Sequence, residues 1–280
     1  MSIHLVIQGA AVAGRDLEQL SQLSGARQVL RLGPGVCRLI GAQQRPGIAE
    51  YCARAKLDFG FVAENRKLAD MGLLAIDMDS TLIAIECIDE IADMAGAKAE
   101  VSAITAAAMR GEIDYAASLR LRVGLLQGLD EGALARVYDE RLRLSPGAET
   151  MLAAMQRAGV KTLLVSGGFS FFTERLKTRL DLDYSISNVL DIEDGRLTGR
   201  VIGGIVDAEA KAAKLRSVRD ALGLTTARVI AIGDGANDVA MMAEAGVSIA
   251  YRAKAVARGK ADYALDYAGL DGVLNLFAGN

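Results

Sequence analysis

The chain has 280 residues, of which 51% are hydrophobic and 24% charged, a globular composition that supports one large domain or two modest ones. The formal net charge is −3 and only 5% of the residues are aromatic, which argues against the basic patch or the stacking platform of a nucleic-acid-binding protein. No apolar run approaches membrane-spanning length and the first residues lack a secretion-signal pattern, so we expect a cytoplasmic protein without a nucleic-acid or membrane partner.

Residues 1–68 are predicted to form a small α+β unit. Short apolar runs alternate here with amphipathic segments, as strands and helices do when they share one layer of core. Strands are predicted at 5–7, 36–40 and 59–61, helices at 16–23 and 48–56, and a turn at 33–35. A polar stretch at 64–70 then connects this unit to the rest of the chain.

A second domain is predicted to span residues 69–280. Near-continuous apolar strands alternate there with helices, a pattern typical of a parallel sheet covered by helices on both faces. Strands are predicted at 73–76, 162–165, 229–232 and 247–250, and helices at 148–158 and 208–222. We therefore expect an α/β fold with a Rossmann-like parallel sheet, and a site at the carboxyl ends of its strands.

Roughly 85 residues separate the first two strands of this sheet, far more than a crossover helix needs. Apolar residues recur there at helical spacing: Ile85, Ile88, Ile91, Leu119, Val123 and Leu126. We expect an inserted helical cap at about 85–145, placed over the strand ends where it can close on a substrate.

Two carboxylates follow the first strand of the sheet, Asp77 and Asp79. Residues two apart on an extended segment share a face, so both side chains point into one cleft. Carboxylates this close repel each other unless a cation, a proton or separate hydrogen-bonding environments relieve them. Taken alone, the pair is better explained as turn aspartates.

Two more carboxylates, Asp234 and Asp238, follow the third strand in a stretch whose glycines let the backbone approach a ligand. A helix cap explains one of these four acids but not all of them. Carboxylates together with water and substrate phosphate are the ligands that Mg²⁺ prefers. The sequence therefore predicts a magnesium site at this edge of the sheet.

The second strand ends in Ser166-Gly167-Gly168, which offers a hydroxyl and backbone N–H groups that can hold an anion. His4 is the only histidine, so Ser-His catalysis and a histidine-rich zinc site are improbable. The three cysteines have no C-x-x-C spacing and no arginine six residues on, which argues against a redox motif or a thiol phosphatase.

In combination these motifs resemble the haloacid dehalogenase superfamily of phosphatases. The D-M-D-S-T run at 77–81, Ser166-Gly167, a helical lysine and G-D-G-A-N-D at 233–238 stand in that superfamily's order. Residues 77–96, 118–123 and 233–250 are similar to its phosphoserine phosphatase family, and the resemblance covers about 70–270. It implies hydrolysis of O-phospho-L-serine, the last step of serine biosynthesis, with Mg²⁺ as cofactor.

The resemblance also implies a role for each polar residue at the strand ends. Asp77 is the expected nucleophile, which forms an aspartyl-phosphate, and Asp79 is the expected acid and base. The expected metal ligands are Asp77, the carbonyl of Asp79, Asp234 and, through waters, Asp238. The expected phosphoryl-binding groups are Ser166, Gly167 and Lys211. Lys214 competes for the lysine role, which the A-K-x-x-x-L pattern at 210–215 assigns to Lys211.

Substrate choice is expected to come from the cap. By the same resemblance, Glu86 pairs with the substrate's ammonium group and Arg122 with its carboxylate, which a guanidinium can bind bidentately. Asn237 is a further expected contact, and Met109 and Tyr115 are expected to close the pocket. The alternative interpretations are that Glu86 is a surface glutamate, that Arg122 is solvated, and that Met109 and Tyr115 pack in the core.

The N-terminal unit resembles the small ACT-like modules that precede some phosphoserine phosphatases, although at about seventy residues it looks short or degenerate. Two alternatives to hydrolysis stay open. One is a phosphotransferase that passes the phosphoryl group to homoserine, and the other is a non-catalytic regulator that binds an amino acid. The sequence does not decide the oligomeric state, and a homodimer is among the assemblies that it allows.

Overall fold

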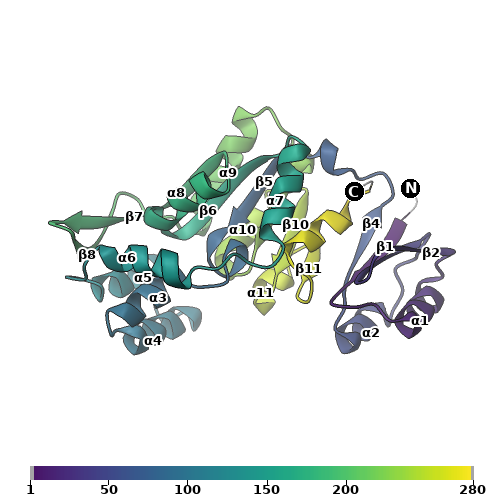
Figure 1. Cartoon of the computed structure of the whole chain (residues 1–280), viewed down its shortest axis with the longest axis horizontal. Coiled ribbons are helices and arrows are strands. Elements are labelled where there is room, and N and C mark those ends of the chain that lie inside the picture. The colour runs from purple at the N-terminus through teal and green to yellow at the C-terminus, as the bar shows by residue number, and fades with distance from the viewer. Residues whose placement is uncertain (1–2, 279–280) are drawn as a thin grey trace.

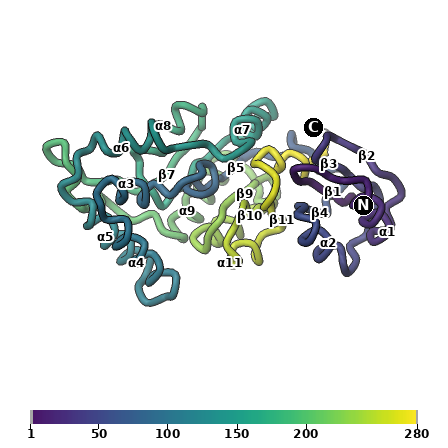
Figure 2. The backbone as a smooth tube through the Cα atoms, turned by 60° about the horizontal axis from the view of Figure 1, so that its bottom comes forward, coloured from purple at the N-terminus to yellow at the C-terminus, as the bar shows by residue number. Residues whose placement is uncertain are grey.

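The computed structural model describes residues 3–278 and contains two sheets, each with its own helices (Figure 1). The molecule is elongated, with the N-terminal unit at one end, the larger sheet in the middle and a helical cap at the other end (Figures 1 and 2). The predicted α/β fold, a parallel sheet with a small N-terminal α+β unit, is confirmed.

The N-terminal unit has the order βαββαβ, a ferredoxin-like arrangement. Its elements are β1 (Ile3–Gln8), α1 (Gly14–Ser24), β2 (Gln28–Gly33), β3 (Val36–Ile40), α2 (Ile48–Ala55) and β4 (Asp58–Ala63). The antiparallel sheet has the order β2-β3-β1-β4. Sequence reasoning missed β2, because this edge strand is exposed along nearly its whole length and so lacks an apolar-polar alternation. The predicted turn at 33–35 is the connection between β2 and β3.

The larger sheet has seven strands in the order β11-β10-β9-β5-β6-β7-β8. They are β5 (Leu73–Asp77), β6 (Lys161–Phe169), β7 (Tyr184–Glu193), β8 (Arg196–Ile202), β9 (Val229–Gly233), β10 (Val247–Tyr251) and β11 (Tyr263–Leu265). Neighbouring strands are parallel except for the β7–β8 hairpin. The four predicted strands are β5, β6, β9 and β10. The hairpin was missed because its residues are mostly half-buried or exposed, and β11 because it is only three residues long.

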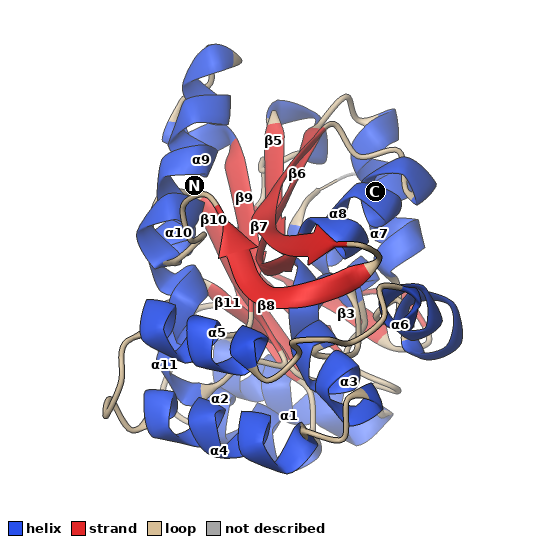
Figure 3. Cartoon of the chain, turned by 90° about the vertical axis from the view of Figure 1, so that its left-hand side faces the viewer, coloured by secondary structure: helices blue, strands red, loops and turns tan. Residues whose placement is uncertain are grey.

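The central strand β5 is buried on both faces, which is why it consists of apolar residues without alternation. Leu73 and Ala75 share a core cluster with α9 (Ala208–Ala221), and Leu74 and Ile76 share the cluster that contains α7 (Ala148–Arg157). Figure 3 shows the helices on both sides of the sheet. Each fully buried leucine or isoleucine here contributes about 1.5–3 kcal/mol. The remaining helices of this domain are α8 (Ser170–Arg179), α10 (Val239–Met242) and α11 (Ala255–Arg258).

The predicted cap is filled by helices: α3 (Cys87–Met94), α4 (Lys98–Met109), α5 (Tyr115–Gly124), α6 (Gly132–Arg136) and a final turn at Val137–Arg141. Asp114 ends the loop before α5, where its carboxylate accepts a hydrogen bond of 2.7 Å from the backbone N–H of Ala117. Strand β8 of the β7–β8 hairpin packs against α5 (Figure 1). The hairpin also exchanges backbone hydrogen bonds with the loop between α5 and α6, among them Leu197 N–H to the carbonyl of Leu129. The cap is thereby attached to the sheet edge as well as to β5.

The N-terminal unit is joined to the larger domain by buried polar contacts. The carboxylate of Asp58 accepts hydrogen bonds from three successive backbone N–H groups at 266–268, at 2.8–3.0 Å. The guanidinium of Arg38 donates to the carbonyls of Asn275 and Phe277 at 2.9 and 2.7 Å. This interface lies between the two sheets, on the side of the larger sheet away from the cap (Figure 2). Among the described residues, no helix is long and apolar enough to span a membrane.

Candidate active site

Three adjacent strands bring the polar residues of the sequence motifs to one edge of the sheet. β5 lies between β6 and β9, and all three run parallel. Asp77 is the last residue of β5, Asp234 directly follows β9, and Ser166 lies where the ladder between β6 and β7 is interrupted. The sequence motifs therefore meet in space, although they are about 70 to 160 residues apart in the chain.

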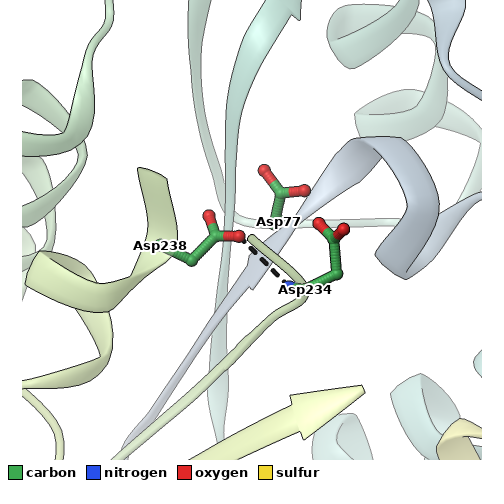
Figure 4. A group of neighbouring side chains, drawn as sticks. All are labelled: Asp77, Asp234 and Asp238. Atoms are coloured by element: carbon green, nitrogen blue, oxygen red, sulfur yellow. Dashed lines mark hydrogen bonds between the residues drawn. The ribbon is translucent and has the colours of Figure 1, made fainter. Parts of the chain in front are cut away.

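The carboxylates of Asp77, Asp234 and Asp238 form an acidic cluster, with ligand atoms within 4.8 Å of one another (Figure 4). All three residues are buried. Carboxylate oxygens gathered in this way suit a hard divalent cation, whose charge would offset their mutual repulsion. The residues present therefore fit the divalent metal site that the sequence predicts.

Lys211 is fully buried beside this cluster. Its ammonium group donates hydrogen bonds to Oδ1 of Asp77 and, at 2.8 Å, to Oδ1 of Asp238. Burial alone would lower the pKa of Lys211, but the carboxylates of Asp238 and Asp77 outweigh burial and raise it above its ordinary value. Lys214 is only half-buried and forms no ion pair with the part of the chain that the structure describes, so of these two lysines Lys211 is the one beside the carboxylates.

One lysine does not neutralise the carboxylates around it. Burial, reinforced by the negative charge of Asp238, raises the pKa of Asp77 well above its ordinary value, although Lys211 opposes that rise. Burial also raises the pKa of Asp234, which Lys254 opposes through an ion pair of 3.3 Å. Lys254 was missed by sequence reasoning, because a lysine before a short helix carries no signal of its own.

Asp238 organises the loop that follows β9. Its Oδ2 accepts hydrogen bonds from the backbone N–H groups of Asp234 and Gly235, at 3.1 and 3.0 Å. A Cβ on Gly233 would lie 2.7 Å from the same oxygen, so this position requires glycine. Asn237 lies half-buried in the same loop. Because both oxygens of Asp238 are engaged by protein donors, its role at a metal through waters stays a prediction.

Asp79 is held by two donors on opposite carboxylate oxygens. Oδ1 accepts from the backbone N–H of Cys87 at 2.8 Å, and Oδ2 accepts from the hydroxyl of Ser166 at 3.3 Å. Burial raises the pKa of Asp79, and these hydrogen bonds oppose that rise. A carboxyl group with a raised pKa in a fixed position is suited to donate and accept a proton.

Glu86 lies at the start of the cap, and its Oε1 accepts a hydrogen bond of 2.7 Å from the hydroxyl of Ser80. Burial and the nearby negative charge of Asp79 raise the pKa of Glu86 to about 7. Arg122 lies half-buried on α5 and forms no ion pair with any described residue. Met109 ends α4 with 70% of its surface exposed, so the structure does not bring it to the other predicted residues.

Gly167 has two partners that connect separate parts of the chain. Its carbonyl oxygen accepts hydrogen bonds from the hydroxyl of Tyr115, in the cap, and from the side-chain amide of Asn188, in β7, at 3.2 and 2.8 Å. Tyr115 was predicted to lie at the pocket. Asn188 was missed, because the strand that carries it was itself not predicted and a lone asparagine gives no signal.

Known proteins resemble this chain over most of its length. A family model described as haloacid dehalogenase-like hydrolase matches residues 74–243, and a model of a domain of unknown function matches residues 5–48. A phosphoserine phosphatase from Polaromonas sp. strain JS666 is 54% identical over 215 residues, which are 75% of this chain and 91% of that protein.

Solved structures extend the likeness to the N-terminal unit. The unliganded crystal structure of a probable phosphoserine phosphatase from Vibrio cholerae has a TM-score of 0.86 and 36% identity, and covers 99% of this chain and 86% of its own. A substrate-bound phosphoserine phosphatase complex has a TM-score of 0.70 and 36% identity, and covers 74% of this chain and 98% of its own.

Proposed function

The chain belongs to the haloacid dehalogenase-like hydrolase family, and we propose that it hydrolyses O-phospho-L-serine to L-serine and phosphate. The observation that carries this proposal is the buried network of Asp77, Lys211 and Asp238 beside Asp234, since a nucleophilic carboxylate and its countercharges are already assembled there. The 54% identity to a phosphoserine phosphatase over 91% of that protein supports the choice of substrate.

In the first step a carboxylate oxygen of Asp77 attacks the phosphorus atom, and the bond from phosphorus to the serine oxygen breaks. The proton on Asp79 moves to the departing serine oxygen, which leaves as a neutral hydroxyl. Lys211 keeps the Asp77 carboxylate in place and provides positive charge where the phosphoryl group arrives. The product of this step is an aspartyl-phosphate on Asp77.

In the second step a water molecule attacks the phosphorus atom of the aspartyl-phosphate. Asp79, now ionised, accepts a proton from this water, and the bond from Asp77 to phosphorus breaks. Phosphate leaves, and the Asp77 carboxylate is restored. The backbone N–H of Gly167, where the ladder between β6 and β7 is interrupted, would bind a phosphoryl oxygen in both steps. Ser166, whose hydroxyl donates to Asp79 in this structure, stays a predicted phosphoryl contact.

The acidic cluster would hold Mg²⁺ through Asp77, the backbone carbonyl of Asp79 and Asp234. When bound, such an ion reduces the repulsion between an anionic nucleophile and an anionic phosphate. Removal of metal with EDTA is expected to lower phosphate release by about a hundredfold or more, and addition of excess Mg²⁺ to restore it. A parallel sample that receives EDTA already saturated with Mg²⁺ controls for the chelator. Full activity in EDTA alone would contradict the metal assignment.

The two ends of the serine moiety are recognised by opposite charges. Glu86 pairs with the ammonium group and Arg122 with the carboxylate, where two parallel hydrogen bonds fix the orientation. Glu86 lies close enough to Asp79 and Asp234 for their charges to raise its pKa, so it borders the reacting centre. Arg122 has no acidic partner among the described residues, which leaves its guanidinium available for the substrate.

The pKa of Glu86, about 7, predicts a pH dependence of substrate capture. Below that pH the side chain is protonated and neutral, so it loses its attraction for the ammonium group. We expect kcat/KM for phosphoserine to fall as the pH decreases from 8 to 6, with up to a tenfold loss per pH unit below the pKa. Glu86→Gln is expected to have low kcat/KM throughout and no such dependence near pH 7. If Glu86→Gln retained the decrease of kcat/KM below pH 7, another titrating group would be responsible for that decrease.

The substrate assignment is tested by phosphate release from L-phosphoserine beside sugar phosphates and small phosphomonoesters. Strong preference for phosphoserine supports the proposal, and activity on another ester alone would contradict the roles of Glu86 and Arg122. Homoserine added to the reaction tests the phosphotransferase alternative, whose product is phosphohomoserine. Binding of serine without any turnover would instead favour the regulator. We further propose that the enzyme acts in the cytoplasm, and a homodimer stays a prediction.

A further inference from the structure

Three side chains meet at one peptide group near the nucleophile. The ladder between β6 and β7 is interrupted between Val165 and Phe169, so the Gly167–Gly168 peptide makes no pairing with the neighbouring strand. Its carbonyl oxygen instead accepts hydrogen bonds from Tyr115 and Asn188. Its N–H, on the Gly168 side, donates to the hydroxyl oxygen of Ser166 at 2.8 Å.

The planarity of the peptide bond connects these contacts. In a trans peptide the C=O and N–H groups point in opposite directions, so donors that hold the carbonyl also fix the direction of the N–H. The Ser166 hydroxyl accepts from that N–H and donates its own proton to Oδ2 of Asp79 at 3.3 Å. Successive hydrogen bonds of this kind polarise and orient one another. These hydrogen bonds therefore form a continuous path from Tyr115 in the cap, through the Gly167–Gly168 peptide and the Ser166 hydroxyl, to Asp79.

The two donors to the Gly167 carbonyl differ in what they connect. Asn188 belongs to the core: its Oδ1 accepts from the backbone N–H of Val206 at 2.8 Å, and the residue is 1% exposed. Tyr115 belongs to the cap, as the first residue of α5. Burial raises the pKa of Tyr115 to about 12, so its hydroxyl remains a donor at any working pH. A Cβ at Gly167 would overlap the Tyr115 oxygen, so this contact requires glycine.

We propose that Tyr115 is a positioning residue that acts through the Gly167–Gly168 peptide and the Ser166 hydroxyl on Asp79. The inference rests on the proposed function, since it concerns the proton that Asp79 transfers to the leaving oxygen. The hydrogen bond forms only when the cap lies on the core. Seating of the cap thereby orients the acid that protonates the leaving group.

Tyr115→Phe tests this proposal, because it removes the hydroxyl and keeps the ring. For phosphoserine, whose leaving group is an alkoxide that needs the proton, we expect kcat to fall about three- to tenfold, the effect of one neutral hydrogen bond. KM is expected to stay within about twofold. For p-nitrophenyl phosphate, whose phenolate leaves without a proton, the rate of the first step, followed as the burst of p-nitrophenolate, is expected to change by less than about twofold. The burst is compared because kcat also contains the second step, in which Asp79 accepts a proton from water for either ester. Tyr138→Phe is the matched control, since Tyr138 also lies half-buried in the cap and its hydroxyl makes no hydrogen bond with the described residues.

The same substitution made in a Ser166→Ala background tests the path. If Tyr115 acts through Ser166, Tyr115→Phe causes no further loss of kcat there. A loss in the p-nitrophenolate burst rate equal to the loss in kcat for phosphoserine, a change in KM alone, or an undiminished loss in the Ser166→Ala background would each overturn the proposal. Activity of the wild type on p-nitrophenyl phosphate without activity on phosphoserine would contradict the proposed function instead. An alkyl phosphate that the wild type hydrolyses then takes the place of phosphoserine in the Tyr115 series.

Discussion

Asp77→Asn is expected to lower kcat for phosphoserine by about ten-thousandfold or more, because the amide cannot attack phosphorus to form the covalent intermediate. The same change removes the buried negative charge of Asp77, whose pKa is raised by burial and by the neighbouring charge of Asp238. The free energy of unfolding is therefore expected to stay unchanged or to increase. Phosphate release checks the predicted loss of kcat, and urea denaturation checks the predicted free energy of unfolding. Both are measured on the metal-free and on the Mg²⁺-loaded protein.

The matched control for this substitution is Asp139→Asn, on an exposed residue of the cap that has no ion-pair partner within residues 3–278. It makes the same chemical change and is expected to leave kcat and stability as they are. Turnover by Asp77→Asn at a tenth of the wild-type rate or more would show that Asp77 is not the nucleophile. Loss of turnover accompanied by unfolding would show instead that the side chain is needed for structure.

Lys211→Met is expected to damage both activity and stability. Methionine fills much of the same buried volume, but it leaves the carboxylates of Asp77 and Asp238 without their shared cation. Removal of one partner from a buried ion pair costs about 3–5 kcal/mol, so a large decrease in the free energy of unfolding is expected in EDTA. Phosphate release is expected to fall by about a thousandfold, since the lysine also binds the transferred group.

The destabilisation by Lys211→Met is expected to depend on pH. Without the lysine, burial raises the folded-state pKa of Asp77 further above its unfolded value, so the protonated carboxyl is favoured in the folded state. The loss of stability is then greatest at neutral pH, where the carboxylates must stay charged or take up protons, and smallest near pH 4. Urea denaturation of wild type, Lys211→Met and the control Lys214→Met at both pH values measures this difference. An equal loss for both lysines would contradict the assignment of Lys211.

The order of the motifs in the sequence predicts the acidic site well, because each motif follows a strand that is recognisable on its own. β5, β6 and β9 each contain a run of apolar residues, and neighbouring parallel strands place their carboxyl ends at the same edge of the sheet. The choice between Lys211 and Lys214 depends on helix phase. Lys211 lies on the same face of α9 as Leu215 and Val218, at i, i+4 and i+7, and this face is the buried one.

The contacts of the Gly167 carbonyl could not be predicted in the same way. Asn188 lies in a hairpin whose strands mix polar and half-buried residues, so no periodicity marks it. Its two hydrogen bonds join residues 21 and 18 positions away, and only the packed structure brings them together. Met109 is exposed because α4 ends at the surface of the molecule, and the local sequence does not indicate where in the fold that end lies.

The contacts of Asp58 and Arg38 have a consequence for synthesis on the ribosome. Their partners at 266–268 and 275–277 follow them by 208 to 239 residues. At the usual rates of translation of about 5–20 residues per second, the nascent N-terminal unit waits roughly 10–50 s for the groups that satisfy these two charges. During that interval it is held together by its own small core alone. A pause in translation beyond residue 70 therefore prolongs the time for which this uncovered surface of the N-terminal unit is accessible to proteases and chaperones.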